Sequence, residues 1–213
     1  LIFKAALLLQ EKTNTVLGAH IQVIKNIPVA AGLGGGSSDA ATALKALNKF
    51  WKLNLSLEEL IRIGSTLGAD VPACLYQQTA FVSGIGENIK PISIAPWTAS
   101  QFIVLVNPNK LLSTQAVFKA YQKNNNAFHE SLPKNTFDKI HTKNAFKKFL
   151  LNTKNDLEDV AKTICPDIHM ILDALKQQSH CTLARMTGSG PTCFALFENK
   201  NWVDGPGYPA DFI

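Results

Sequence analysis

The stretch that decides the fold reads Pro28-Val29-Ala30-Ala31-Gly32-Leu33-Gly34-Gly35-Gly36-Ser37-Ser38-Asp39-Ala40-Ala41. Its glycines let the backbone approach a ligand with no Cβ in the way, and they allow positive φ where the chain must turn. Ser37 and Ser38 open an Ala- and Leu-rich run to Lys52 that lacks glycine and proline, which predicts a helix. The unpaired N–H groups and the positive dipole end of this helix predict an anion site suited to phosphate.

Two common nucleotide-binding motifs do not fit this stretch. The motif G-x-x-x-x-G-K-[ST] requires a lysine after the last glycine, and the dinucleotide motif G-x-G-x-x-G requires a glycine at the same place, but this chain has Ser37 there. A flexible turn before an N-capped helix remains the simpler alternative. The stretch is therefore a phosphate-binding candidate of another class.

The composition is that of a globular protein with one sizeable core or two modest ones, since 46% of its 213 residues are hydrophobic. The net charge of +5 suits an anionic substrate, but the lysines are scattered, so no nucleic-acid partner is expected. The longest apolar run, at 1–9, is broken by Lys4 and is far shorter than the roughly 20 residues of a membrane span. No membrane partner is expected.

The four cysteines, at 74, 165, 181 and 193, lack CxxC pairing. They are interpreted as buried reduced thiols, and no metal site formed by protein side chains is predicted.

The residue patterns predict an α+β protein, because strands do not alternate strictly with helices. Helices are expected over 1–9, 40–52, 57–67, 114–123, 143–151, 156–162 and 166–178, and strands over 20–25, 79–83, 89–94, 102–106 and 182–186. We expect domains at 1–97 and 98–200, followed by an irregular tail at 201–213. Because the chain begins with Leu1 inside a predicted helix, we also expect that an N-terminal segment is missing.

Asp70 and a second glycine turn are the other candidate site features. Asp70 lies in the restricted sequence Gly68-Ala69-Asp70-Val71-Pro72, where a carboxylate is equally expected to cap a helix or to act as a base. The second turn, Thr187-Gly188-Ser189-Gly190-Pro191, follows the last predicted strand, and a simple hairpin turn is its plain interpretation.

Several ordered motifs resemble those of the GHMP kinases, a family of small-molecule kinases. They are the glycine stretch at 28–41, Leu67-Gly68-Ala69-Asp70-Val71-Pro72, Gly84-Ile85-Gly86-Glu87, Asn155-Asp156-Leu157-Glu158, and Met186-Thr187-Gly188-Ser189-Gly190-Pro191-Thr192-Cys193-Phe194. The resemblance covers nearly all of positions 1–198, and several motifs in order are more specific than any one of them alone.

The resemblance implies a two-domain α+β fold, with an incomplete N-terminal domain like the second domain of ribosomal protein S5 and a ferredoxin-like C-terminal domain. It implies a kinase that uses ATP and Mg²⁺ to phosphorylate the 2-hydroxyl of cytidine diphosphate methylerythritol in non-mevalonate isoprenoid (terpenoid) biosynthesis. Homoserine or mevalonate phosphorylation, or a non-catalytic nucleotide-binding relative, is the alternative. The implied protein is a monomer or homodimer in the bacterial cytoplasm or a plastid.

The same resemblance assigns roles to individual residues. The ATP phosphates would be held by Pro28, Ala30, Gly32, Leu33, Gly34, Gly35, Gly36, Ser37 and Ser38, and Asp70 would be the catalytic base. Gly188, Ser189 and Gly190 would bind substrate and pack against the phosphate loop and Asp70. Phe118 would also bind substrate by stacking on cytosine, although core packing explains a lone helical phenylalanine equally well.

Some further residues lie outside these assigned roles. The family's N-terminal lysine, and the histidine that follows an aromatic residue, are not found and are expected before Leu1. Asn155 with Glu158 is interpreted as a helix N-cap pair, Glu87 as structural, and Lys25 has no predicted partner.

Overall fold

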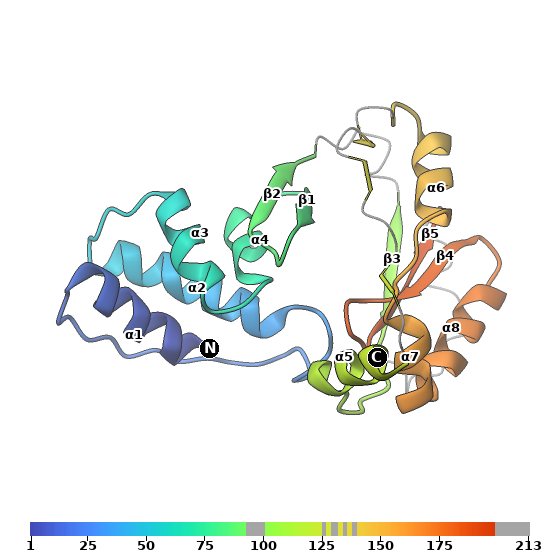
Figure 1. Cartoon of the computed structure of the whole chain (residues 1–213), viewed down its shortest axis with the longest axis horizontal. Coiled ribbons are helices and arrows are strands. Elements are labelled where there is room, and N and C mark those ends of the chain that lie inside the picture. Colours follow the sequence, from blue (N-terminus) through green and yellow to red (C-terminus); the bar gives the residue numbers. More distant parts are fainter. Residues whose placement is uncertain (93–100, 125–126, 129–131, 134–135, 138–139, 199–213) are drawn as a thin grey trace. The chain divides into compact units, whose positions relative to one another are not determined.

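The computed structural model describes residues 1–92, 101–124, 127–128, 132–133, 136–137 and 140–198 (Figure 1). The chain forms two compact units, of which the first holds residues 1–27 and 34–93 and the second holds 28–33 together with the chain from residue 94. The first half of the glycine stretch thus belongs to the second unit, and the helix that follows it belongs to the first. The predicted irregular tail at 201–213 lies outside the described residues.

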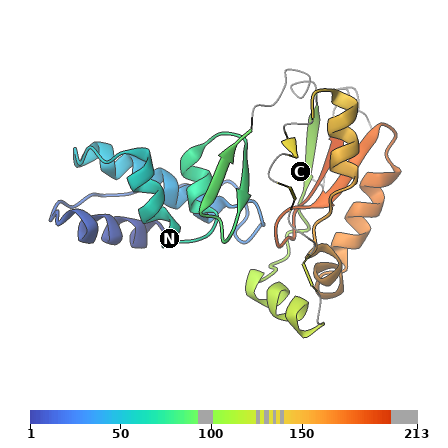
Figure 2. The same cartoon turned by 45° about the horizontal axis from the view of Figure 1, so that its top comes forward.

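The first unit is mostly helical in its described part. Its elements are α1 (Ile2–Thr13), α2 (Gly35–Phe50), α3 (Leu57–Ser65), α4 (Val71–Tyr76), β1 (Ala80–Ser83) and β2 (Asn88–Pro91). The central helix, α2, packs against α1, α3 and α4, and its buried face carries Ala40, Leu44 and Leu47. β1 and β2 pair as an antiparallel hairpin (Figure 2).

Local sequence signals explain where some of these helices begin. Ser56 and Glu59 form the capping box expected of S-x-x-E, because the Ser56 hydroxyl accepts from the Glu59 N–H and the Glu59 carboxylate accepts from the Ser56 N–H. Helix α4 was not predicted, although Pro72 at its start is compatible with a first helical turn, where no intrahelical N–H bond is required.

The predicted strand over 20–25 is wrong. Among the described residues of the first unit, only β1 and β2 form a ladder, so the segment has no neighbouring strand with which to pair its backbone. Its alternating apolar pattern is real, however, since Ile21 and Val23 line a groove together with Phe3 and Leu7 of α1. The pattern identified a face of the segment without identifying a partner strand.

The second unit is an antiparallel sheet with helices. Its elements are β3 (Phe102–Val106), α5 (Thr114–Lys123), α6 (Lys143–Leu151), α7 (Glu158–Ile164), α8 (Asp167–Gln177), β4 (Cys181–Met186) and β5 (Cys193–Phe197). The strand order is β3-β5-β4, with β5 in the centre. Residues 187–192 form the hairpin loop between β4 and β5.

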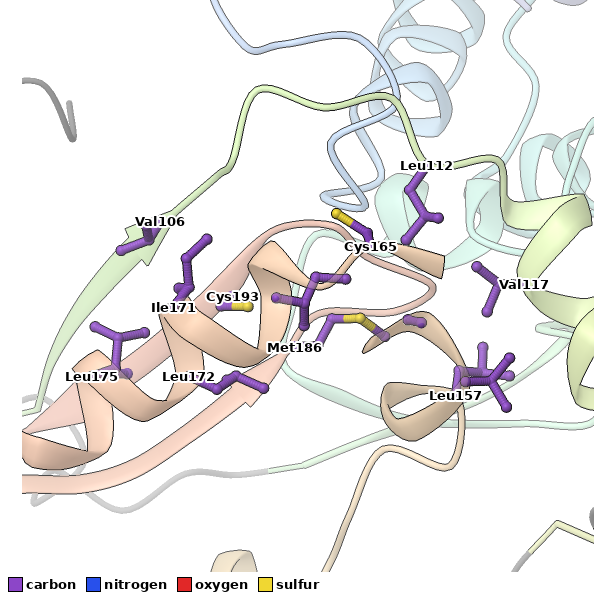
Figure 3. Close-up of a cluster of buried hydrophobic side chains, with 14 of the residues drawn as sticks. Val106, Leu112, Val117, Leu157, Cys165, Ile171, Leu172, Leu175, Met186 and Cys193 are labelled. Atoms are coloured by element: carbon purple, nitrogen blue, oxygen red, sulfur yellow. The ribbon is translucent and has the colours of Figure 1, made fainter. Parts of the chain in front are cut away.

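The core of this unit lies between the sheet and α8 (Figure 3). Ile171, Leu172 and Leu175 of α8 pack there with Met186 of β4 and Cys193 of β5. Alternate residues of the strands point to the opposite face, where Leu183 and Leu196 line a small cavity with Phe146 and Leu150 of α6. The sheet therefore has helices on both faces.

The prediction that 102–106 is a buried strand is correct in type but wrong in burial. The described structure pairs β3 only with β5, so it is an edge strand, and Ile103 and Leu105 are 60% and 52% exposed. A continuous apolar run does not by itself distinguish a central strand from an edge strand.

We predict that Gly64→Ala destabilises the first unit, although alanine favours helices. A Cβ at Gly64 would lie 2.7 Å from Leu75 Cδ1 and 2.9 Å from Val71 Cγ1, so these buried side chains, or α4 that carries them, would have to shift. We expect a loss of about 1–3 kcal/mol in the free energy of unfolding, as for other overpacked cores. Denaturant unfolding followed by circular dichroism measures it.

The matched control is Arg62→Ala, an exposed position on the same helix, which should change the free energy of unfolding by no more than about 0.5 kcal/mol. A Gly64→Ala protein as stable as the wild type would contradict the close packing of α3 on α4.

Candidate functional site

The start of α2 is built from the glycine run itself. Gly34 is the N-cap residue and has a left-handed backbone with φ 66°, and the helix begins at Gly35, two residues before the predicted start at Ser37. No side chain caps the helix, and no acidic residue lies in its first turn. The first-turn N–H groups are therefore left for a ligand, and they lie at the positive end of the helix dipole.

A lysine lies beside this helix start. The Lys25 ammonium pairs with the Asp39 carboxylate of the first α2 turns and lies 3.8 Å from the place that a Cβ at Gly35 would occupy. Both side chains are only about one third exposed, at 38% and 30%. This partner of Lys25 could not be predicted from the sequence, because the pair forms only when the segment before Pro28 folds back along α2.

The other half of the glycine stretch, residues 28–33, is fixed by the hairpin loop of the second unit. The Gly32 carbonyl accepts a 2.8 Å hydrogen bond from the Thr187 hydroxyl, and the Ala31 carbonyl accepts a 3.2 Å bond from the Thr192 N–H. Gly32 has φ +73°, and a Cβ there would lie 2.3 Å from the Gly190 carbonyl oxygen. Glycine is therefore required at position 32 by conformation and by space.

The hairpin interpretation of the second glycine turn is thus confirmed, and the turn also makes contacts with the first glycine stretch. It is the hairpin loop that joins β4 and β5, and its residues also contact Ala31 and Gly32. Thr192, at the end of the loop, is buried, and its hydroxyl accepts from the Asn107 amide at 2.7 Å.

Asp70 occupies the N-cap position of α4, but its carboxylate makes no cap hydrogen bond. The side chain is exposed, in the same unit as the α2 start, and α4 packs against α2. Burial raises the pKa of the nearby Cys74 thiol, and the negative charge of Asp70 raises it further. Of the two roles that the sequence left open, helix capping is not the one observed.

The turn between β1 and β2 supports the Asp70 segment. A Cβ at Gly86 would lie 2.0 Å from the Ala69 carbonyl oxygen, so the turn packs closely against the residue that precedes Asp70. Glu87 accepts hydrogen bonds from the Ile85 N–H at 2.7 Å and from the Asn88 amide at 3.0 Å. Its predicted structural role is confirmed.

Phe118 does not belong to the buried core, because it is 40% exposed while its neighbour Val117 is fully buried. It lies one helical turn after Thr114, and residues four apart share one face of a helix. The Thr114 and Ser189 hydroxyls are 2.7 Å apart. The exposed ring of Phe118 therefore lies on the α5 face that meets the second glycine turn.

The prediction that Asn155 and Glu158 form a reciprocal N-cap pair is wrong, although Asn155 Oδ1 accepts from the Leu157 N–H at 3.0 Å, as a capping side chain would. The N-cap residue of α7 is Leu157, which makes no side-chain cap bond, and Glu158 is the first helical residue. Both polar side chains instead reach the start of the second glycine turn. The Asn155 amide donates to the Met186 and Gly188 carbonyls, and the Glu158 carboxylate accepts from the Met186 N–H. Sequence spacing could not show this contact, since it joins residues about thirty positions apart.

The cysteines form no disulfide in the part of the chain that the structure describes. All four cysteines are unpaired, with Cys165 and Cys193 buried and Cys74 and Cys181 partly so. Burial raises the pKa of Cys193 to about 12. The residues that the structure describes contain no cluster of three His, Cys, Asp or Glu side chains able to hold a metal ion. None of the described helices is both long enough and apolar enough to cross a bilayer.

Two family models match the chain. The model for the N-terminal domain of GHMP kinases matches residues 1–78, and the model for their C-terminal domain matches residues 134–203. Each match contains one of the two glycine turns.

Relatives and solved structures agree with these models. The chain is 42% identical over 204 residues to a 4-diphosphocytidyl-2-C-methyl-D-erythritol kinase of Chelativorans sp., covering 94% of this chain and 66% of that protein. A crystal structure of 4-(cytidine 5'-diphospho)-2C-methyl-D-erythritol kinase superposes with a TM-score of 0.67 at 30% identity, covering 93% of this chain and 69% of the other.

A homoserine kinase from Cytophaga hutchinsonii has the same TM-score of 0.67 at 17% identity, covering 94% of this chain and 67% of the other, and so shares the fold alone. The chain spans just under two thirds of the length of the curated relatives it matches, 64% to 66% for three of them. The two family models, the relatives and the superposed structures agree, and the chain belongs to the GHMP kinase family.

Proposed function

We propose that the protein transfers the γ-phosphoryl group of ATP to the 2-hydroxyl of 4-diphosphocytidyl-2-C-methyl-D-erythritol. The observation that carries this proposal is the 42% identity, over 94% of the chain, to a kinase named for that substrate. The uncapped helix start at Gly34–Ser38 supports it, because it is the type of site that binds phosphate. We place the reaction in the bacterial cytoplasm or a plastid, the compartments that the family resemblance implies.

The phosphates of ATP would lie at the start of α2. There the N–H groups of the first helical turn would point toward the anion, at the positive end of the α2 helix dipole. Glycines at 34–36 would let the phosphate oxygens come close to the backbone. Lys25 supplies a positive charge at the same place, because its ammonium lies close to Gly35. Phosphate oxygens would compete with Asp39 for this ammonium group.

Mg²⁺ would be held largely by the nucleotide. This cation usually takes one or two protein carboxylates, substrate phosphates and several waters, so it requires no cluster of protein ligands. Asp39, which lies in the first turns of α2, is the carboxylate placed to contribute. When bound, the ion neutralises the charge that develops on the phosphates during transfer.

Asp70 would act as the general base. As the acceptor hydroxyl oxygen attacks the γ-phosphorus, its proton passes to the carboxylate, the bond from phosphorus to the β–γ bridging oxygen breaks, and ADP leaves. The exposure of this carboxylate and its lack of a cap hydrogen bond support the role, since a carboxylate engaged as a cap would be a weaker base.

Phe118, Gly188, Ser189 and Gly190 are the residues that we propose for binding the cytidine end of the acceptor. The exposed Phe118 ring offers a surface on which a pyrimidine can stack, and Ser189 on the neighbouring turn offers a hydroxyl. Gly188 and Gly190 would leave the turn's backbone open to the ligand.

The proposal is tested by incubating the intact protein that carries this sequence with γ-labelled ATP and a panel of acceptors. We expect label transfer to 4-diphosphocytidyl-2-C-methyl-D-erythritol, with little transfer to homoserine or mevalonate. Preference for either of those acceptors would refute the substrate assignment. Nucleotide binding without transfer to any acceptor would refute the kinase activity.

We predict that Asp70→Asn lowers kcat by at least about a hundredfold, the usual cost of removing a general base. Glu58→Gln is the control, because it removes an exposed carboxylate from α3 of the same unit. Steady-state kinetics and circular dichroism together separate loss of chemistry from loss of folding. A folded Asp70→Asn enzyme with near-normal kcat would show that another group is the base.

We predict that Lys25→Met raises the KM for ATP about tenfold, because it removes a charged hydrogen-bond donor from the phosphate site while keeping the apolar stem. The control is Lys49→Met, which removes an exposed lysine from the far end of α2. Equal KM values for the two variants would show that Lys25 serves only to pair with Asp39.

A further inference from the structure

The turn at residues 155–158 is fastened to the second glycine turn by side chains. Asn155 Nδ2 donates to the Met186 carbonyl at 3.0 Å and to the Gly188 carbonyl at 2.7 Å. Its Oδ1 accepts from the Leu157 N–H at 3.0 Å. One amide group thus uses both of its N–H bonds to fix the backbone on either side of Thr187.

Glu158 completes this attachment. Its Oε2 accepts from the Met186 N–H at 3.0 Å, and its Oε1 pairs with Lys162 at 2.7 Å, so both carboxylate oxygens are engaged. The side chain is only 16% exposed, which shields these contacts from water. Met186 itself is buried, and its backbone groups require such partners.

Thr187 links this attachment to the first glycine stretch. It lies between the two residues that Asn155 holds, and its hydroxyl donates to the Gly32 carbonyl at 2.8 Å. Gly188 also approaches that carbonyl, because a Cβ there would lie 3.5 Å from the Gly32 oxygen. Gly32 belongs to the same glycine stretch as Gly34, the N-cap residue of α2, and lies two residues before it in the sequence.

We propose that Asn155 is a positioning residue for nucleotide binding, which acts through Thr187 on the backbone at Gly32. This inference rests on the proposed function, because it takes the glycine stretch to be the ATP phosphate site. Asn155 touches neither nucleotide nor acceptor in this role. Its effect should therefore fall on ATP binding and not on binding of the acceptor.

The test compares Asn155→Asp with Asn152→Asp in the intact protein. Asn155→Asp keeps the shape and the Oδ1 acceptor but replaces the donating NH2 with an oxygen that repels the two carbonyls. Asn152→Asp makes the same change of charge at an exposed residue just after α6. We expect Asn155→Asp to raise the KM for ATP about tenfold while the KM for the acceptor at saturating ATP changes less than about twofold. The control should match the wild type.

A second pair of variants tests the link itself and does not depend on the folding of Asn155→Asp. Thr187→Val removes only the hydroxyl and should raise the KM for ATP, whereas Thr187→Ser keeps the donor and should recover most of the affinity. Combined, Asn155→Asp and Thr187→Val should raise the KM for ATP less than the product of their separate effects, because both act on one contact.

Two results would overturn the proposal. One is an ATP KM within about twofold of the wild type for both Asn155→Asp and Thr187→Val. The other is an equal rise in the KM values for ATP and acceptor, which would indicate a general structural role. If the wild type transfers phosphate to no acceptor, the proposed function fails, and ATP dissociation constants of the same variants, measured by equilibrium dialysis, still decide this inference.

Discussion

The structure depends on one close backbone approach, that of Gly32 to Gly190. Any side chain at position 32 would place its Cβ within 2.3 Å of a carbonyl oxygen, and φ +73° at this residue disfavours every L-amino acid with a Cβ. With glycine there, the Ala31 and Gly32 carbonyls can accept hydrogen bonds from Thr192 and Thr187. Two turns that lie about 155 residues apart in sequence are thereby held together.

The strands and helices of the second unit also hold the hairpin loop in the position that this contact requires. The β4–β5 ladder sets the span of the hairpin loop, and the core under α8 holds both strands in place. In the first unit, α2 begins without a side-chain cap, so no side chain satisfies the N–H groups of its first turn. Packing of α4 against α2 then sets the position of Asp70 within that unit.

Local chemistry could be predicted from the sequence, and contacts between distant segments could not. The glycine turn that opens a helix and the Ser56 capping box each depend on a few adjacent residues, and each was identified from them. For Asp70, adjacent residues left a capping role and a role as a base equally open. The Lys25–Asp39 pair and the Asn155 contacts depend on the folded chain, so the sequence left Lys25 without a partner and gave Asn155 a capping role. The strand expected over 20–25 was wrong for the same reason, since alternation describes a face and not a neighbour.

The second unit is discontinuous in sequence, because residues 28–33 belong to it while the chain on both sides of them belongs to the first. A fragment that began at residue 94 would lack Ala31 and Gly32. The Thr187 hydroxyl would then lose the Gly32 carbonyl as an acceptor, and the Thr192 N–H would lose the Ala31 carbonyl. The part of the chain from residue 94 onward is therefore not the whole of the second unit. A C-terminal fragment of this chain would have to include residues 28–33 to keep these two hydrogen bonds.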